Sequence, residues 1–255
     1  MLVANLEKAE PLKKIVNTLI DLIGNIEWNI SENGIYIHTM NTCHTCVIDV
    51  HIPSSAFISY NCEENFVVNI SLANFSKILK CISNEQSIYI SIEKLDEMIL
   101  YFQDKEGNTR EYNMQLLAPN EDDSFIVELP ENNIHDVQIS FNGEELNTLI
   151  KEFSSIGENI HIEIEDKKIK FSTEGEIGKA HVLFNNKNIE IKVDNVDLGI
   201  FSARYLMSMV KSCCMIQEGF DVEVYLSEEK PIMLIYNLMN SFGKLTYFLA
   251  PKMLD

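Results

Sequence analysis

Two short stretches of the sequence hold residue types that could do chemistry. The first is Cys43-His44-Thr45-Cys46, with His51 nearby, which has part of the spacing of a zinc site. A closed zinc site needs four ligands, typically two such pairs, and the chain has no second Cys-x-x-Cys. Cys213 and Cys214 are adjacent and do not supply that spacing. We therefore predict no metal site and interpret the first stretch as strand-end cysteines.

The second stretch is Gly175-Glu-Ile-Gly178-Lys179, which resembles a fragment of a phosphate-binding loop. It lacks the full six-position frame and the Ser or Thr after the lysine. The ten glycines of the chain are not clustered, and no motif pairs a nucleophile with a base. We therefore predict that the chain is not an enzyme and that it binds no cofactor.

The most informative spacing belongs to lysines. The segment Ser71–Cys81 predicts a short helix with Ser71 as its N-cap. Ala73, Lys77 and Lys80, at i, i+4 and i+7, would lie along one face of it. The segment holds no acid, although the chain carries a net charge of −19. The alternative is an ordinary surface helix whose charged residues happen to be lysines. The rest of the chain must decide between this helix and one that belongs to a basic set.

Hydrophobic periodicity predicts three further helices, at Pro11–Ile23, Gly143–Phe153 and Ser202–Ser212. Period-two alternation predicts strands in the first half at Leu2–Leu6, Glu27–Ser31, Ile35–Thr39, Val47–Ile52, Phe66–Ile70, Ser87–Ile92, Met98–Phe102 and Arg110–Leu116. The second half has the same signal at Val137–Phe141, Ile160–Ile164, Ile169–Thr173, His181–Phe184, Ile189–Val193, Leu198–Phe201, Phe220–Leu226, Ile232–Tyr236 and Leu245–Leu249.

The pattern restarts after an acidic stretch, Ala118–Asn133, which holds two prolines, five acids and no base. Asn17-Thr-Leu-Ile20 recurs as Asn147-Thr-Leu-Ile150, and other matches keep the same order at offsets of 130 to 134 residues. We therefore predict an α+β fold of two similar domains, each with two helices packed on antiparallel sheet. Their expected bounds are 1–117 and 134–255, joined by a linker over 118–133.

The predicted helices are basic, whereas the chain is acidic. Residues 11–22, 71–82, 143–154 and 202–213 hold seven bases and four acids, a net charge of +3. The other 207 residues must carry −22, since the whole chain carries −19. Bases segregated in this way create a local field that attracts a phosphate backbone. Lysines without interleaved aromatic residues favour contact with phosphates over contact with bases of DNA.

Length and cysteine content bound the remaining possibilities. At 255 residues the chain can form one large domain or two of about 120 residues. Six cysteines without a framework spacing suit a reducing cytosol or nucleus. No apolar run approaches the ~18–20 residues that a membrane span needs, and the N-terminus lacks a signal-peptide pattern. We expect no membrane association.

Several stretches of the sequence resemble a known family, proliferating cell nuclear antigen, the eukaryotic sliding clamp of DNA replication. The resemblance is carried by Ser76-Lys-Ile-Leu-Lys-Cys81, Ala203-Arg-Tyr-Leu206, Phe171-Ser-Thr-Glu-Gly-Glu-Ile-Gly178 and Tyr247-Phe-Leu-Ala-Pro-Lys252. Pro11-Leu-Lys-Lys14 agrees in position, and the likeness runs nearly end to end. It implies a DNA-clamp fold assembled as a homotrimeric ring in the nucleus, with sheets outside and helices around duplex DNA.

The resemblance also assigns residues to three sites. The bases that face DNA would be Lys13, Lys14, Lys77, Lys80, Lys151, Arg204 and Lys211. The subunit interface would join two edge strands through Lys77, Arg110, Tyr112, Met114, Gly178, Ala180 and Val182. A pocket for short partner peptides (the PIP box) would be lined by Met40, His44, Val47, Phe125, Ile126, Leu129, Pro231, Phe248, Ala250 and Pro251.

The implied function is that of a processivity factor in DNA replication and repair. Its partners would be duplex DNA, bound without sequence preference, and DNA polymerase, clamp loader, ligase and flap endonuclease. Two departures from the family motivate an alternative. The linker reads Phe125-Ile-Val-Glu-Leu-Pro130, and Asp166 stands where the family often has a modified lysine, with Lys167 and Lys168 beside it as possible substitutes. The alternative is a paralogous clamp with a DNA-damage response or checkpoint signalling role.

Overall fold

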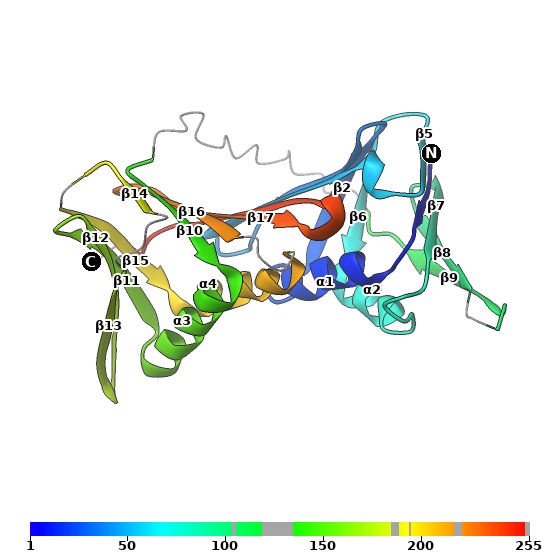
Figure 1. Ribbon diagram of the computed structural model, residues 1–255. Helices are drawn as coiled ribbons and strands as arrows, with labels where there is room; N and C mark the ends of the chain where they lie inside the picture. Colours follow the sequence, from blue (N-terminus) through cyan, green and yellow to red (C-terminus); the bar gives the residue numbers. More distant parts are fainter. Residues whose placement is uncertain (104–105, 119–134, 185–188, 194, 217–220, 253–255) are drawn as a thin grey trace. The chain divides into compact units, whose positions relative to one another are not determined.

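The structure is a computed structural model, which describes residues 1–103, 106–118, 135–184, 189–193, 195–216 and 221–252 (Figure 1). The chain divides into two compact units. Unit 1 comprises Met1–Met40, Ile48–Val127 and Leu238–Leu245, and unit 2 comprises Asn41–Val47, Glu128–Asn237 and Thr246–Asp255. Each unit therefore takes a short segment from the other half of the sequence, which the two continuous ranges expected from the repeat do not include.

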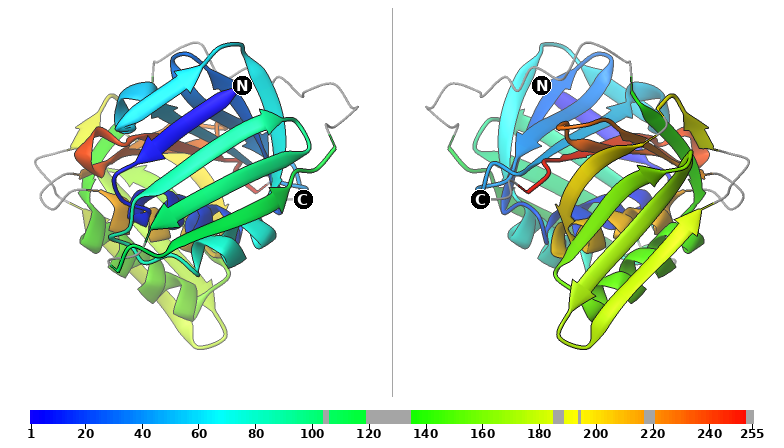
Figure 2. Two further views of the ribbon diagram at one scale, coloured as in Figure 1. Left: turned by 90° about the vertical axis from the view of Figure 1, so that its right-hand side faces the viewer. Right: turned by 90° about the vertical axis from the view of Figure 1, so that its left-hand side faces the viewer.

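Unit 1 contains two helices and two antiparallel sheets. Its elements are β1 (Leu2–Leu6), α1 (Glu10–Leu19), β2 (Asn25–Ser31), β3 (Gly34–Met40), most of β4 (Cys46–Pro53), η1 (Ser54–Ala56), β5 (Ser59–Cys62), β6 (Phe66–Ser71), α2 (Leu72–Leu79), β7 (Ile88–Lys94), β8 (Glu97–Gln103) and β9 (Thr109–Gln115). One sheet has the order β5-β1-β7-β8-β9, and the other runs β6-β2-β3-β4 (Figure 2, left). The helices α1 and α2 pack against each other.

Unit 2 repeats this plan. Its elements are β10 (Val137–Asn142), α3 (Gly143–Ile156), β11 (Asn159–Glu165), β12 (Lys168–Gly175), β13 (Gly178–Phe184), β14 (Ile189–Ile191), β15 (Val196–Ser202), α4 (Ala203–Met209), η2 (Val210–Met215), β16 (Asp221–Leu226) and β17 (Ile232–Leu238). In the chain they are followed by η3 (Met239–Ser241), which belongs to unit 1, and by β18 (Gly243–Leu249), which is divided between the units at Leu245. One sheet has the order β13-β12-β11-β15, and the other runs β14-β10-β16-β17 (Figure 2, right). The helices α3 and α4 again pack together.

Aromatic side chains fill the core between helices and sheets in each unit. In unit 1 the ring of Trp28 meets Phe75 of α2 edge to face, with centroids 5.7 Å apart. In unit 2 Phe141, Phe171 and Phe184 meet one another edge to face at 5.2–5.9 Å. Edge-to-face pairs of this kind add to the free energy gained from burying the rings. The ring pair of unit 1 therefore joins α2 to β2, and the three rings of unit 2 join β10 to β12 and β13.

Three local features depart from the expected boundaries. The helix expected to reach Ile23 ends at Leu19, and the amide of Ile20 donates to Val16 before the chain turns. The helix expected over Ser202–Ser212 changes to a 3₁₀ helix at Val210. The strand β5 was not predicted, because Ser-Tyr-Asn-Cys has no apolar alternation; it forms by pairing with β1.

Candidate nucleic-acid interface

The helix α2 presents two lysines on a face without acids. Its N-cap is Ser71, whose hydroxyl accepts from the amide of Asn74 at 3.5 Å, as the sequence predicts. On one face Leu72, Phe75 and Leu79 are buried. Ala73, Lys77 and Lys80 are exposed. No described residue forms an ion pair with either lysine. The expected basic row on α2 is therefore confirmed as an exposed surface.

The helix α1 carries its two lysines in a different setting. The ammonium of Lys13 donates to the carbonyl of Ile82, beyond the end of α2, at 2.7 Å. The ammonium of Lys14 forms an ion pair with Glu10 one turn earlier, at 2.8 Å. The hydrogen bond from Lys14 lowers the pKa of Glu10. The structure thus binds both lysines within unit 1.

The helix α3 places Lys151 among acids. Glu144, Glu145 and Glu152 are exposed on the same helix as Lys151. The first two lie in the first turn, where the side chain of Asn142 accepts from both of their amides at 3.0 and 3.4 Å. Acids at this end of a helix are stabilised by the helix dipole. The surface of α3 is consequently acidic overall.

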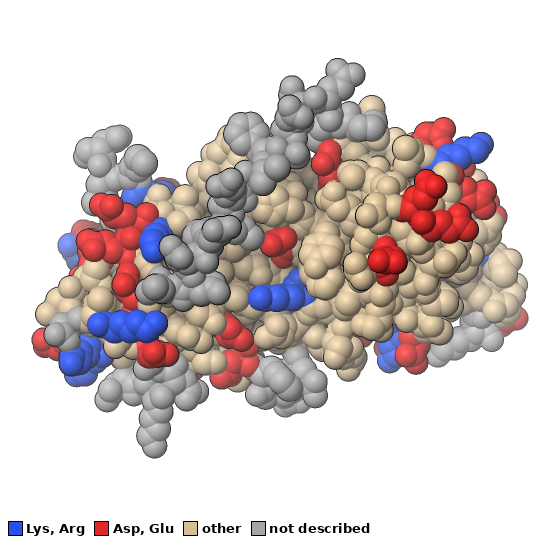
Figure 3. Space-filling view, turned by 90° about the horizontal axis from the view of Figure 1, so that it is seen from above, with Lys and Arg blue, Asp and Glu red and all other residues tan. Residues whose placement is uncertain are grey.

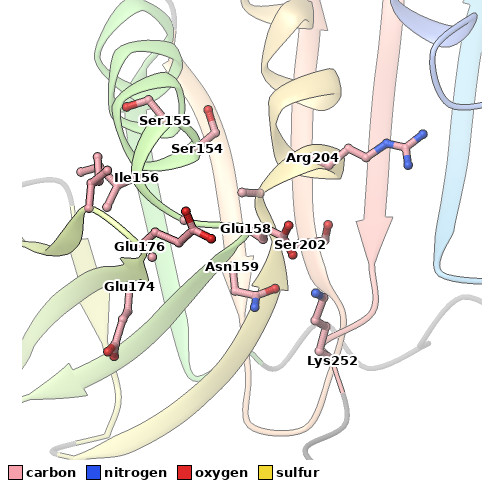
Figure 4. A pocket seen from close by; sticks show the side chains of 14 residues that line it. Ser154, Ser155, Ile156, Glu158, Asn159, Glu174, Glu176, Ser202, Arg204 and Lys252 are labelled. Carbon is pink, nitrogen blue, oxygen red and sulfur yellow. The ribbon is translucent and has the colours of Figure 1, made fainter.

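The helix α4 presents Arg204 in its first turn. Its side chain is exposed, and in Figure 4 it extends away from the carboxylates of Glu158 and Glu176. Those carboxylates line a surface hollow of about 900 Å³ at the start of α4, and Arg204 lines the same hollow. Lys211 is also exposed, but it lies on η2. Arg204, Ser208 and Lys211 stand at i, i+4 and i+7 in the sequence, like the row on α2, but they do not share one continuous α-helix.

Acidic residues gather elsewhere on the molecule. On the face seen in Figure 3, acidic side chains form clusters and basic side chains are scattered between them. Among the described bases of unit 2, Lys170 forms an ion pair with Glu163 at 2.9 Å and Lys179 with Glu174 at 2.7 Å. The bases of α2 and Arg204 differ, since no described carboxylate lies within ion-pair distance of them.

The two strands predicted to form the subunit interface both lie at the edge of a sheet. β9 pairs with β8 and β13 pairs with β12, and no second described strand pairs with either. On β9, Arg110 is exposed and the ring of Tyr112 stacks on Phe102 with centroids 5.4 Å apart. A hydrogen bond with the thiol of Cys81 raises the pKa of Tyr112. Met114 differs from expectation, because its side chain is buried in the core of its own unit.

On β13 the residues predicted at the interface are accessible. Gly178 is exposed, and Ala180 and Val182 are half-buried. Glu176 and Ile177 make the tight turn between the paired residues Gly175 and Gly178, so this stretch is a β-hairpin and not a phosphate loop. Two exposed apolar side chains here are not among the predicted interface residues: Ile177, in this turn, is 77% exposed, and Leu183, on β13, is 47% exposed. The sequence signal for Leu183 was its place on a predicted strand.

Part of the predicted peptide pocket lies in unit 2. The loop that holds His44 is closed by Asn41, whose side-chain oxygen Oδ1 accepts from the backbone amides of Thr45 and Cys46 at 2.9 and 3.0 Å. The amide of Ala250 donates to Thr45 at 2.9 Å, which brings the C-terminal segment beside this loop. The other residues have varied burial: Val47 is buried, His44 is exposed, and Met40, Pro231, Phe248 and Pro251 are half-buried. Phe125, Ile126 and Leu129 lie outside the described residues.

The cysteines near His44 differ in burial. Burial raises the pKa of the Cys46 thiol to about 12, whereas Cys43 is exposed. Over the described ranges, no three His, Cys, Asp or Glu side chains are grouped so that they could hold a metal ion. A membrane-spanning candidate is also absent from the described helices, none of which is long and apolar enough.

Comparison with known proteins agrees with this geometry. The N-terminal domain model of proliferating cell nuclear antigen matches residues 1–125, and the C-terminal domain model matches residues 128–252. The chain is 26% identical to "Proliferating cell nuclear antigen 2" of Drosophila melanogaster and 28% identical to "Proliferating cell nuclear antigen" of Saccharomyces cerevisiae. Both comparisons cover 100% of this chain and 99% of the relative.

These matches span both repeats and confirm the expected α+β clamp fold. Members of the family are non-enzymatic clamps, in agreement with the absence of a catalytic motif from the sequence. The chain belongs to the proliferating cell nuclear antigen family.

Proposed function

We propose that the protein is a homotrimeric sliding clamp that encircles duplex DNA in the nucleus. The observation that carries this proposal is that β9 in unit 1 and β13 in unit 2 are both edge strands of their sheets. Two different edges on one chain permit head-to-tail pairing, and head-to-tail pairing closes into a ring when the rotation per subunit allows it. Pairing would also cover the backbone groups that an open edge exposes.

Bases on the helices supply a contact with DNA that does not depend on sequence. Exposed lysine and arginine side chains attract phosphates by charge, and the described helices have no groove-reading motif of aromatic or amide side chains. A weakly basic lining lets water and counterions remain between protein and duplex. Encirclement, and not affinity, would then retain the clamp while it slides.

The protein would act as a processivity factor by tethering other proteins to DNA. Its proposed partners are DNA polymerase, the clamp loader, ligase and flap endonuclease, each bound through a short peptide. The supporting observation is the loop of His44 beside Ala250, together with Pro231, Phe248 and Pro251, which are half-buried and so can offer apolar surface. We propose that the linker residues complete this pocket.

Two measurements test the clamp. Light scattering should give about three times the chain mass of 29.2 kDa. Protein loaded on nicked circular DNA by a eukaryotic clamp loader should be retained, and cutting the circle should release it. A monomer at micromolar concentration, or equal escape from circles and linear DNA, would refute the proposal.

A second candidate is a paralogous clamp with a role in the DNA-damage response or in checkpoint signalling. It is favoured by the turn between β11 and β12, where Asp166 takes the place of the family's modified lysine and Lys167 and Lys168 are exposed beside it. Both Asp166 and Lys167 have positive φ, at 49° and 61°. A loaded ring that fails to stimulate a replicative polymerase would support this candidate over the first.

A further inference from the structure

One face of the sheet β5-β1-β7-β8-β9 in unit 1 is open. The buried residues of its strands, such as Ile90 of β7 and Leu100 of β8, point to one side, because side chains alternate along a strand. Figure 2 (left) shows the sheet from the other side, where no described helix or strand of unit 1 lies in front of it. Residues that point to this side therefore meet solvent or a partner.

Four aromatic or aliphatic side chains form a patch on this open face. Tyr89 and Tyr101 are paired across β7 and β8, and their rings meet edge to face with centroids 5.9 Å apart. Val3 and Ile99 lie in the neighbouring row, since both pair with Ser91. Tyr101 is 37% exposed, and the other three are half-buried. We call this patch, which consists of Val3, Tyr89, Ile99 and Tyr101, the tyrosine face.

Acids border the tyrosine face. Glu111 of β9 is paired with Tyr101 and is exposed. The hydrogen bond between the Tyr101 hydroxyl and the Glu111 carboxylate raises the pKa of Tyr101, and the nearby Glu93 raises it further. No lysine or arginine in the described part of the chain forms an ion pair with Glu93 or Glu111. The border is therefore negatively charged and lacks a described counter-ion.

This chemistry selects a cation, and arginine in particular. Tyrosine ring faces attract cations, and carboxylates add to that attraction. A guanidinium stacks on an aromatic ring and also donates two parallel hydrogen bonds to a carboxylate, which the ammonium of lysine cannot do. Phosphates of a nucleic acid or of an anionic membrane would be repelled by Glu93 and Glu111. Val3 and Ile99 add apolar contact area for the aliphatic side chains of a peptide.

The tyrosine face is separate from the surfaces assigned to the clamp. It shares no residue with the basic helices, with the predicted interface or with the predicted peptide pocket. Glu111 lies on β9, but its neighbour Tyr112 points to the other side of the sheet, where its ring stacks on buried Phe102. Binding at the tyrosine face therefore does not need the side chains that the proposed ring contact uses.

We infer that the tyrosine face docks an arginine-bearing peptide segment of another protein, with guanidinium groups stacked on Tyr89 or Tyr101 and paired with Glu111. This surface is a second docking site, beyond the peptide pocket of the proposed clamp. It does not depend on ring formation, because every residue that forms it belongs to one sheet of unit 1.

The test uses the full chain and the peptide Gly-Arg-Leu-Arg-Gly, labelled with an uncharged dye and followed by fluorescence anisotropy. A peptide with both arginines replaced by citrulline is the first control, because citrulline keeps the planar shape and loses the charge. It should bind about tenfold more weakly or worse. A peptide with both arginines replaced by lysine should bind more weakly than the arginine peptide, because lysine cannot stack or pair in the same way.

Variants of the chain locate the site. Tyr89→Thr and Tyr101→Thr remove the rings but keep β-branched residues that suit a strand, and each should weaken binding of the arginine peptide about two- to fivefold. Glu111→Gln should weaken it to a similar extent. Tyr101→Phe keeps the ring and frees Glu111 from the hydroxyl, so the affinity should be retained. Tyr36→Thr and Glu32→Gln, which change an exposed tyrosine and an exposed acid on the hairpin of β2 and β3, are matched controls and should have no effect.

Equal affinity for the arginine and citrulline peptides would overturn the inference, because the site would then not recognise charge. Equal affinity for the arginine and lysine peptides would overturn the choice of arginine. If Tyr89→Thr combined with Tyr101→Thr left the affinity unchanged, the peptide would be held only by diffuse attraction to an acidic chain, which also overturns the inference. Light scattering of each variant verifies that binding is compared in one assembly state.

Discussion

The two units have the same plan, but their equivalent first helices differ in charge. Each unit has two helices side by side on antiparallel strands, and their cores are built from inward-alternating apolar residues. The helix α1 of unit 1 holds two lysines and one glutamate, whereas its counterpart α3 in unit 2 holds one lysine and three glutamates. Burial thus constrains the inward positions of both copies to one architecture, while exposed positions diverge at little cost in stability.

The largest expected effect concerns the connection that follows the first helix of each unit, because the two connections differ in how closely they are packed. A side chain at Gly157, after α3, would meet the carbonyl of Glu174 at 2.4 Å, whereas Gly24, after α1, has nothing within 4 Å. Gly157→Ala should therefore lower the free energy of unfolding by about 2–3 kcal/mol. Gly24→Ala should change it by less than ~0.5 kcal/mol. Urea denaturation measures both, and equal effects would show that the connections do not differ.

A smaller effect is expected at the edge of unit 1. Tyr112→Ala removes an aromatic ring from β9, and its stacking on Phe102, so it should weaken trimer association roughly tenfold. Tyr36→Ala is the control, since Tyr36 is 44% exposed on β3, away from both open edges. Sedimentation across a dilution series gives the association constant. A Tyr112→Ala protein that remains trimeric at nanomolar concentration would remove β9 from the interface.

The smallest effect compares the caps of the two equivalent helices. The hydroxyl of Ser71 accepts from Asn74 at the start of α2, whereas Ser202 makes no side-chain hydrogen bond at the start of α4. Ser71→Ala should cost about 0.5–1 kcal/mol of unfolding free energy. Ser202→Ala should be neutral. Thermal unfolding of the pair resolves this difference, and an equal cost would indicate that Ser202 caps α4 in solution.

Most of the architecture could be read from local signals. Alternation along strands such as Ile160–Ile164 and helical spacing around Phe75 depend on neighbours in the sequence, so both were predictable. The strand β5 was not, because its polar residues become a strand through pairing with β1. The end of α4 also depends on packing, since η2 buries Ser212, whose hydroxyl contacts that of Tyr247 at 2.9 Å.

The candidate site was predictable in its residue types and less so in their partners. Glu10 and Lys14 are four residues apart, but the helix was expected to begin at Pro11, so the charge count left Glu10 out. The hydrogen bond between Lys13 and Ile82 joins residues 69 positions apart, and no local sequence pattern predicts it. Exposed bases can be predicted from the sequence. Whether they are neutralised depends on contacts with residues that are distant in the sequence, which local patterns do not predict.

The edge strands β9 and β13 give the proposed clamp the character of a bifunctional monomer in polymer chemistry, with one head and one tail. Such a monomer has two products, a closed ring or a growing linear chain, and the rotation between successive subunits selects one of them. A fragment that keeps one of these two strands and lacks the other would act as a chain stopper and would prevent both products.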